Sequence, residues 1–196
     1  MPDAISSLLW IVTTLTFFVL IDRTMLWLVP RIASARAMAI VRRRAGGINR
    51  LHFHGLNTPT NCRTPMSTAD ALMTLCPYDV SGCALRLSVT IPQDVYWSIC
   101  CYGPNADNIF SMNDLQAVQK IGRHVVFVLH CDSVKLDTAD NEVSVPLKSS
   151  RGILLIRTGV PDPHDETSLC LLASNQKLAN LVCYSEEDAA EFRELR

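Results

Sequence analysis

Several signatures of common functional sites are missing from this sequence. No two of its eight cysteines are spaced C-x-x-C, the separation that structural zinc and iron–sulfur sites prefer. There is no G-x-S-x-G nucleophile elbow and no glycine-rich phosphate-binding loop. The 18 basic and 19 acidic residues leave a net charge of −1, which creates no bulk field that would attract nucleic acid. We therefore expect no cofactor, no metal centre and no nucleic-acid partner, and we favour a role other than catalysis.

A long uncharged run near the N-terminus is the clearest positive feature. Residues 5–21 carry no charge, and residues 24–29 continue the apolar pattern after Asp22 and Arg23. At about 1.5 Å per residue the first run covers about 25 Å, slightly less than the hydrocarbon core of a bilayer, so Asp22 and Arg23 would lie near one interface. Trp10 and Trp27 would approach the two headgroup layers. We predict one transmembrane helix in residues 1–30, ended by Pro30, with the lipid bilayer as its surroundings.

Two other interpretations of this run are weaker. A soluble domain rarely offers a pocket for so long a helix that is apolar all round. A cleavable signal peptide would have Ala33-Ser34-Ala35 as a weak cleavage site, but the sequence lacks a positively charged beginning and the apolar stretch is longer than usual.

Residues 31–47 form a basic segment next to the predicted span. Its arginines would contact anionic headgroups or a neighbouring subunit, and the cluster Arg42, Arg43 and Arg44 is the densest part. Arginines follow the helix and none precede it, so the positive-inside tendency places the C-terminal part in the cytoplasm. We expect a globular domain in residues 48–184 and an acidic tail in residues 185–196.

The globular part is predicted to be mainly β. Residues 85–91 alternate between apolar and polar, residues 124–130 give another strand, and residues 152–160 are apolar enough for a central strand. Residues 95–114 predict a hairpin that turns at Gly103-Pro104-Asn105. A first short strand is expected at 49–54, a capped helix from Ser67 to Cys76, and a C-terminal helix over 167–184. Together these elements favour an antiparallel β-sandwich or jelly roll behind the membrane helix.

Candidate ligand-binding residues gather on and near the hairpin. Oxygen-bearing side chains suit a hard cation, and aromatic side chains suit a sugar, although tight turns and sheet faces use the same residue types. His52 and His54 would face one side of a strand, where a polar strand face is favoured over a metal site. His124, His130 and Asp132 are an alternative acid–base group at a strand end. The candidate binding residues are Trp97, Tyr102, Asn108, Asn113, Asp114 and His124.

The cysteines have two interpretations. Most of the eight can be small buried core residues. Disulfides are the alternative if the domain lies outside the cytoplasm, and their connectivity cannot be deduced from the sequence.

Three segments together resemble a bacterial family catalogued as domain of unknown function twelve-fifty-four. They are LCPYDVSG at 75–82, YWSICCYGPNADNIFSMND at 96–114 and RGILLIRTGVPDP at 151–163. The resemblance covers roughly residues 48–184 and implies a sandwich anchored in the inner membrane, usually on the extracytoplasmic side, with no settled activity for the small members. The aspartate expected after Tyr102 is replaced by Gly103, and the cluster Arg42 to Arg44 is unusual for the family. The side of the membrane is therefore left open.

The favoured function is a non-catalytic, single-pass domain that binds a partner, as an accessory subunit of a larger membrane complex. Its motivation is the pair Asp22 and Arg23, because charges at that depth prefer a protein partner or an interface. The expected contact residues are Trp10, Asp22, Arg23, Trp27, Arg42, Arg43 and Arg44. The alternative is an envelope enzyme or ligand-binding module that acts on a glycan or lipid.

Overall fold

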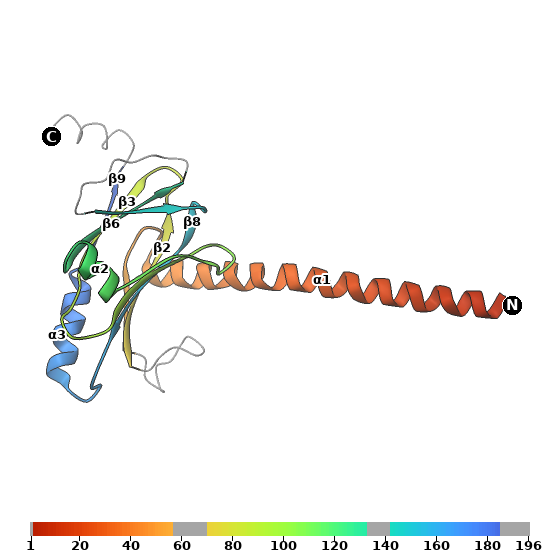
Figure 1. The fold of residues 1–196 in the computed structure, drawn as a ribbon, viewed down its shortest axis with the longest axis horizontal. Helices are drawn as coiled ribbons and strands as arrows, with labels where there is room; N and C mark the ends of the chain where they lie inside the picture. The colour runs from red at the N-terminus through yellow and green to blue at the C-terminus, as the bar shows by residue number, and fades with distance from the viewer. Residues whose placement is uncertain (1, 57–69, 133–141, 185–196) are drawn as a thin grey trace.

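A computed structural model describes residues 2–56, 70–132 and 142–184, and Figure 1 shows their arrangement. A single long helix extends from a two-sheet domain. The helices are α1 (Pro2–Ala45), α2 (Asp114–Lys120) and α3 (Glu166–Lys177). The strands are β1 (His52–Leu56), β2 (Ala71–Asp79), β3 (Ala84–Thr90), β4 (Trp97–Tyr102), β5 (Asn108–Asn113), β6 (His124–Cys131), β7 (Glu142–Leu147), β8 (Arg151–Gly159) and β9 (Asn180–Tyr184).

Helix α1 is continuous through Pro30, so the predicted end of the helix at that residue is wrong. Proline removes one backbone hydrogen bond, whereas ending the helix there would leave several backbone groups without partners. The alanines and arginines that follow are strong helix formers and carry the helix to Ala45. Residues 31–45 therefore continue the N-terminal helix as one rod. Within the described residues, Ile5–Ala45 is the one helix long and apolar enough to span a membrane.

The strands form two sheets. One has the order β1-β2-β8-β4-β5 and the other β7-β6-β3-β9, and every pair is antiparallel except β6 with β7. The predicted strands over 85–91, 124–130 and 152–160 and the 95–114 hairpin are confirmed. The fold is mixed, with helix and strand in about equal amounts because α1 is so long. The expectation of a mainly β chain is corrected in this respect, and the jelly roll is not confirmed.

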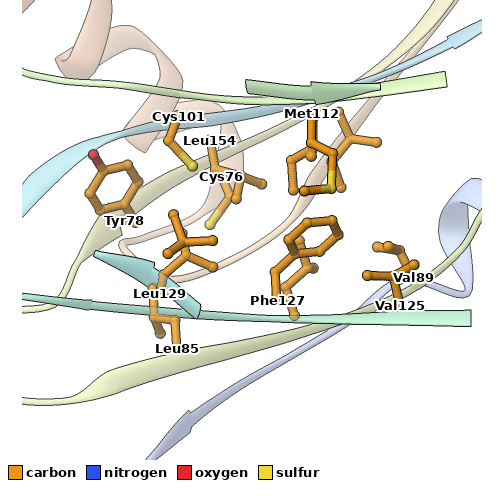
Figure 2. Packing of buried hydrophobic residues seen from close by; sticks show 14 of the residues in the cluster. Cys76, Tyr78, Leu85, Val89, Cys101, Met112, Val125, Phe127, Leu129 and Leu154 are labelled. Atoms are coloured by element: carbon orange, nitrogen blue, oxygen red, sulfur yellow. The ribbon is translucent and has the colours of Figure 1, made fainter. Parts of the chain in front are cut away.

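The core lies between the two sheets. Figure 2 shows Cys76, Cys101 and Leu154 from the five-stranded sheet facing Leu85, Phe127 and Leu129 from the four-stranded sheet. These side chains are almost completely buried. They come from alternate positions of each strand, as expected when one face of each sheet is covered by the other.

Residues 71–79 are a strand, so the predicted helix over 67–76 is wrong from Ala71 onward, and residues 67–69 lie outside the described residues. Pro77 is accommodated because β1 pairs only with Leu72 to Leu75. The Pro77 carbonyl accepts a hydrogen bond from the Asn49 amide at 2.8 Å, on the side of β2 where no strand continues. Since the amide and carbonyl of one strand residue point to the same side, the missing donor of Pro77 interrupts no ladder.

The C-terminal helix is shorter than predicted. Helix α3 ends at Lys177, and Asn180–Tyr184 forms β9, which pairs with β3 at the edge of the four-stranded sheet. Gln176 is buried and donates to the carbonyls of Leu72 and Ile156, which fixes the helix against the five-stranded sheet. Cys183 on β9 forms a disulfide with Cys83, so the disulfide interpretation applies to this pair. The acidic tail lies outside the described residues.

Replacing Gly152 with alanine is expected to lower the free energy of unfolding by about 1–3 kcal/mol. A Cβ at this buried position would overlap the Tyr102 carbonyl and the Tyr78 ring. Urea unfolding of the full chain in detergent, followed by circular dichroism, measures the change. Gly82→Ala is the matched control, because a Cβ there meets nothing within 4 Å and should alter stability by no more than about 0.5 kcal/mol. Equal stability of the two variants would contradict the packing described here.

Candidate functional site

A mainly apolar hollow lies between α1 and the outer face of the five-stranded sheet. It is a groove of about 520 Å³. One wall is α1 from Ala33 to Arg44, and the other is formed by β2, β8 and the β4–β5 turn. We call this hollow the helix–sheet groove. Its volume falls within the range of about 300–1,000 Å³ that is typical of ligand pockets.

The first wall follows from the way α1 packs on the sheet. Ser34, Met38 and Val41 are half-buried and spaced four and three residues apart, so they lie on one side of the helix. Ala33, Ala37 and Ile40 also line the groove but remain exposed. The small alanine side chains leave room beside the contact, so the groove stays open along this flank of the helix.

The second wall is set by strand register. Leu75 pairs with Leu155, and Tyr102 pairs with Ile153, which places all four on the outer face of the sheet. The turn after β4 closes one end through Gly103, Pro104 and Ala106. The Gly103 amide donates to the Asp107 carbonyl at 2.9 Å, and this bond folds the turn back on itself.

Positive charge borders the groove. Arg44 is part of its lining, and the lining residues that belong to the described ranges include no aspartate or glutamate. Partial burial, with the charges of His54 and Arg44, lowers the pKa of His52 on the neighbouring strand. Burial raises the pKa of the Tyr102 phenol, and the nearby charge of Arg157 opposes that rise. Within the described part of the chain Arg157 has no ion pair, and its Nε is buried without a hydrogen-bond partner.

The predicted ligand residues do not converge. Trp97 is 2% exposed and stacks on Phe127 with ring centroids 6.2 Å apart, so it belongs to the core and offers no open platform. His124 lies on the other sheet, where its ring nitrogens are 3.3 Å from Ser88 Oγ and 3.2 Å from Thr90 Oγ1. Among the six predicted residues, Tyr102 alone lines the groove.

The amide and carboxylate residues of the hairpin have local roles. Asn113 caps α2 by accepting from the Gln116 amide at 2.9 Å, while the Asn113 amide donates to the Gln116 side chain. Asp114 is the first residue of that helix, where a negative charge complements the helix dipole. Asn108 is exposed at the start of β5. The Asn113 side chain thus bonds a nearby backbone amide, as the tight-turn interpretation expects of such residues, and the helix cap that it forms was not predicted.

The predicted acid–base group of His124, His130 and Asp132 does not form, so this alternative is wrong. His124 and His130 lie near opposite ends of β6, and six residues of strand separate them by about 20 Å. His130 is buried, with Nε2 2.8 Å from Ser144 Oγ and Nδ1 3.0 Å from the Cys131 carbonyl. The rings of His52 and His54 lie 6.3 Å apart, and no third histidine, cysteine or acidic residue in the described ranges joins them to form a metal site.

The thiols of two buried cysteines are expected to be unreactive. Burial raises the pKa of both Cys76 and Cys101 to about 12, so their thiols stay protonated and weakly nucleophilic at neutral pH. Cys170 is exposed on α3. Cys62 lies outside the described residues.

The predicted membrane contacts lie along the exposed length of α1. Trp10, Asp22, Arg23 and Trp27 are all exposed to the surroundings of the helix. Arg31 lies over the Trp27 ring at 3.8 Å, a pairing suited to a membrane interface. Arg42 and Arg43 are exposed one turn from the end of α1, whereas Arg44 faces the groove.

The groove itself is not among the sequence predictions. Helix α1 was expected to end at Pro30, so its later residues had no predicted place against the sheet. One signal was available, because Ser34, Met38, Val41 and Ala45 recur at helical spacing after the proline. That pattern indicates a helix face with a packing partner.

Comparison with known proteins supports the fold alone. No family model and no curated protein matches the sequence. The crystal structure of the VPA0106 protein from Vibrio parahaemolyticus is similar over 81% of this chain, with 12% identity and a TM-score of 0.57. An uncharacterised protein from Burkholderia cenocepacia is similar over 79% of the chain, with 16% identity and a TM-score of 0.49. The chain spans 36% and 41% of the lengths of these two proteins. The resemblance to domain of unknown function twelve-fifty-four stays a prediction.

Proposed function

We propose that this chain is a non-catalytic accessory subunit of a bacterial inner-membrane complex, anchored by α1 and bound to its partner within the bilayer. The observation that carries the proposal is the pair Asp22 and Arg23, exposed within the otherwise uncharged stretch of residues 5–29. Neither side chain forms an ion pair with a described residue. Ionisable groups at this depth are costly in lipid and favour a polar contact from another helix.

The depth of the pair supports a contact below the headgroups. Trp10 and Trp27 are separated by 17 residues, or about 25 Å of helix, which approaches the thickness of the hydrocarbon core. If these tryptophans mark the interfaces, Asp22 lies about 7 Å inside the nearer one. The expected partner is therefore a membrane-spanning helix with its own ionisable or polar side chain at the same level.

The disulfide supports an extracytoplasmic position for the sheets. Cys83 and Cys183 are joined, and disulfides persist outside the reducing cytoplasm. The arginines after the span favour the opposite orientation. We give the disulfide more weight, because it is formed within the folded domain itself, whereas the positive-inside rule is a statistical tendency.

Double substitution of Asp22 and Arg23 by leucine is expected to weaken the association about tenfold, because it removes the polar contact inside the bilayer. The full chain is extracted in mild detergent and sized under native conditions against its monomer mass of 21.8 kDa. A stoichiometric complex should be lost in the double variant and kept in Thr16→Leu, a control on the same helix.

Two outcomes contradict the proposal. The first is a native protein that runs as a monodisperse monomer under these conditions. The second is a complex whose stability is the same in the double variant and in the control, because the charged pair would then have no part in assembly.

A further inference from the structure

We propose that the helix–sheet groove holds an acyl chain of an anionic phospholipid from the bilayer in which α1 is anchored. The groove combines about 520 Å³ of space with a lining made largely of aliphatic side chains. Such a lining favours a hydrocarbon chain over a polar ligand, because apolar surface gains free energy when it leaves water. This inference does not require the protein partner proposed above.

The shape of the groove favours a chain-like ligand over a protein helix. An α-helix is about 10 Å wide and rises 5.4 Å per turn, so one turn occupies roughly 420 Å³. Because the groove extends for roughly 16 Å along α1, from Ala33 to Arg44, this volume makes it too narrow in cross-section to admit a helix. An extended acyl chain can fill the same volume along its length.

The position of the groove gives it access to lipid. Ala33 follows Trp27 by six residues, so the groove begins about 9 Å beyond the residue expected at the interface. The headgroup layer on each side of a bilayer is several ångströms thick. A lipid drawn partly out of the bilayer along α1 can therefore place one acyl chain in the groove, with its headgroup at the Arg44 end.

Charge complementarity selects an anionic headgroup. Arg44 lines the groove near its far end, and Arg42 and Arg43 precede it on the same helix. A basic residue near a membrane surface attracts anionic lipid by about fivefold in affinity. Among the described residues, no acidic side chain lines the groove to oppose this attraction.

A second set of polar groups lies on the same sheet face. Arg157 and Ser98 are paired in register, two residues along their strands from Leu155 and Cys100. Ser98 is 5% exposed, and its Oγ, like the Nε of Arg157, is buried without a hydrogen-bond partner. Buried polar atoms are normally paired, so these two atoms mark a place on the same sheet face, outside the groove lining, where a polar partner is missing.

The test uses the full chain in nanodiscs of phosphatidylglycerol and phosphatidylcholine. The probe is phosphatidylglycerol with a photoreactive group near the end of one acyl chain, and labelled peptides are mapped by mass spectrometry. Label on the β8 residues Ile153 to Leu155 is the expected result, because these lie on the sheet and away from the apolar part of α1. The same probe on phosphatidylcholine should label them about fivefold less.

Two matched pairs of variants sharpen the result. Ala37→Phe fills the groove and should abolish label on β8, whereas Ala39→Phe, on an exposed part of α1 outside the lining, should leave it unchanged. Arg44→Gln should reduce the preference for phosphatidylglycerol about fivefold, and Arg42→Gln, which does not line the groove, should reduce it less.

The inference is overturned by label confined to residues 5–29, by equal labelling of β8 in the two phenylalanine variants, or by equal labelling from the two lipids. Intact Cys83–Cys183 disulfide in each variant shows that the domain has folded. A loss of partner binding with β8 labelling preserved would contradict the proposed function and leave the lipid site standing.

Discussion

Replacing Trp97 with alanine is expected to lower the free energy of unfolding by about 3–5 kcal/mol, the loss typical of a large aromatic side chain removed from a core. Trp97 is 2% exposed and packs against Phe127 across the space between the sheets. The surrounding strands cannot fill the resulting cavity without disturbing their register. Urea unfolding of the full chain in detergent measures the loss.

The neighbouring Tyr96→Ala is the control for this experiment. Tyr96 is 57% exposed, and its backbone carbonyl, which accepts from the Gly159 amide at 2.7 Å, is unaffected by the substitution. The free energy of unfolding of the Tyr96→Ala variant should differ from that of the native protein by no more than about 0.5 kcal/mol. A Trp97 variant as stable as the Tyr96 variant would show that Trp97 is not a core residue and would revive its role as a binding platform.

Replacing both Cys83 and Cys183 with serine is expected to lower the free energy of unfolding by about 2–4 kcal/mol. The disulfide joins residues 100 positions apart and attaches the edge strand β9 to β3. A cross-link over so long a loop restricts the unfolded chain strongly, although the size of this effect depends on the model used for the unfolded state. Cys170→Ser is the control, because Cys170 is an exposed free thiol and its loss removes no cross-link.

The same pair reports the side of the membrane. In protein extracted from cells in the presence of an alkylating agent, Cys83 and Cys183 should remain joined in the disulfide and escape alkylation. Their thiols should react with a second alkylating agent only after reduction. Two free thiols at these positions in freshly extracted protein would place the domain in a reducing compartment and contradict the proposed orientation. The double-serine variant would then have the stability of the native protein.

Much of the sheet structure could be predicted because its sequence alternates. Leu85, Leu87 and Val89 are all buried on one face of β3, as their period of two indicates. Val143, Val145 and Leu147 alternate in the same way, yet β7 was not predicted, and neither was the capping pattern Asn113 to Gln116 that begins α2. Both elements could therefore have been predicted from these local sequence patterns.

Other features depended on contacts that local patterns do not contain. Ala71, Leu72 and Leu75 have helical spacing, but pairing with β8 makes this segment a central strand. Tertiary pairing outweighs a weak helix propensity in such a segment. The helix–sheet groove requires Leu75, Leu155 and Arg44 to meet from three distant segments, and only the folded chain brings them together.

If α1 is anchored in a membrane as proposed, the absence of a break at Pro30 makes it a lever as well as an anchor. About 27 Å of helix lie between Trp27 and Ala45, where the sheets are attached. Spanning helices tilt by about 20° on average, and a rod of this length would carry its far end sideways by roughly 9 Å at that angle. Changes in bilayer thickness that alter the tilt would thus shift the whole domain across the membrane surface without any change in its internal structure.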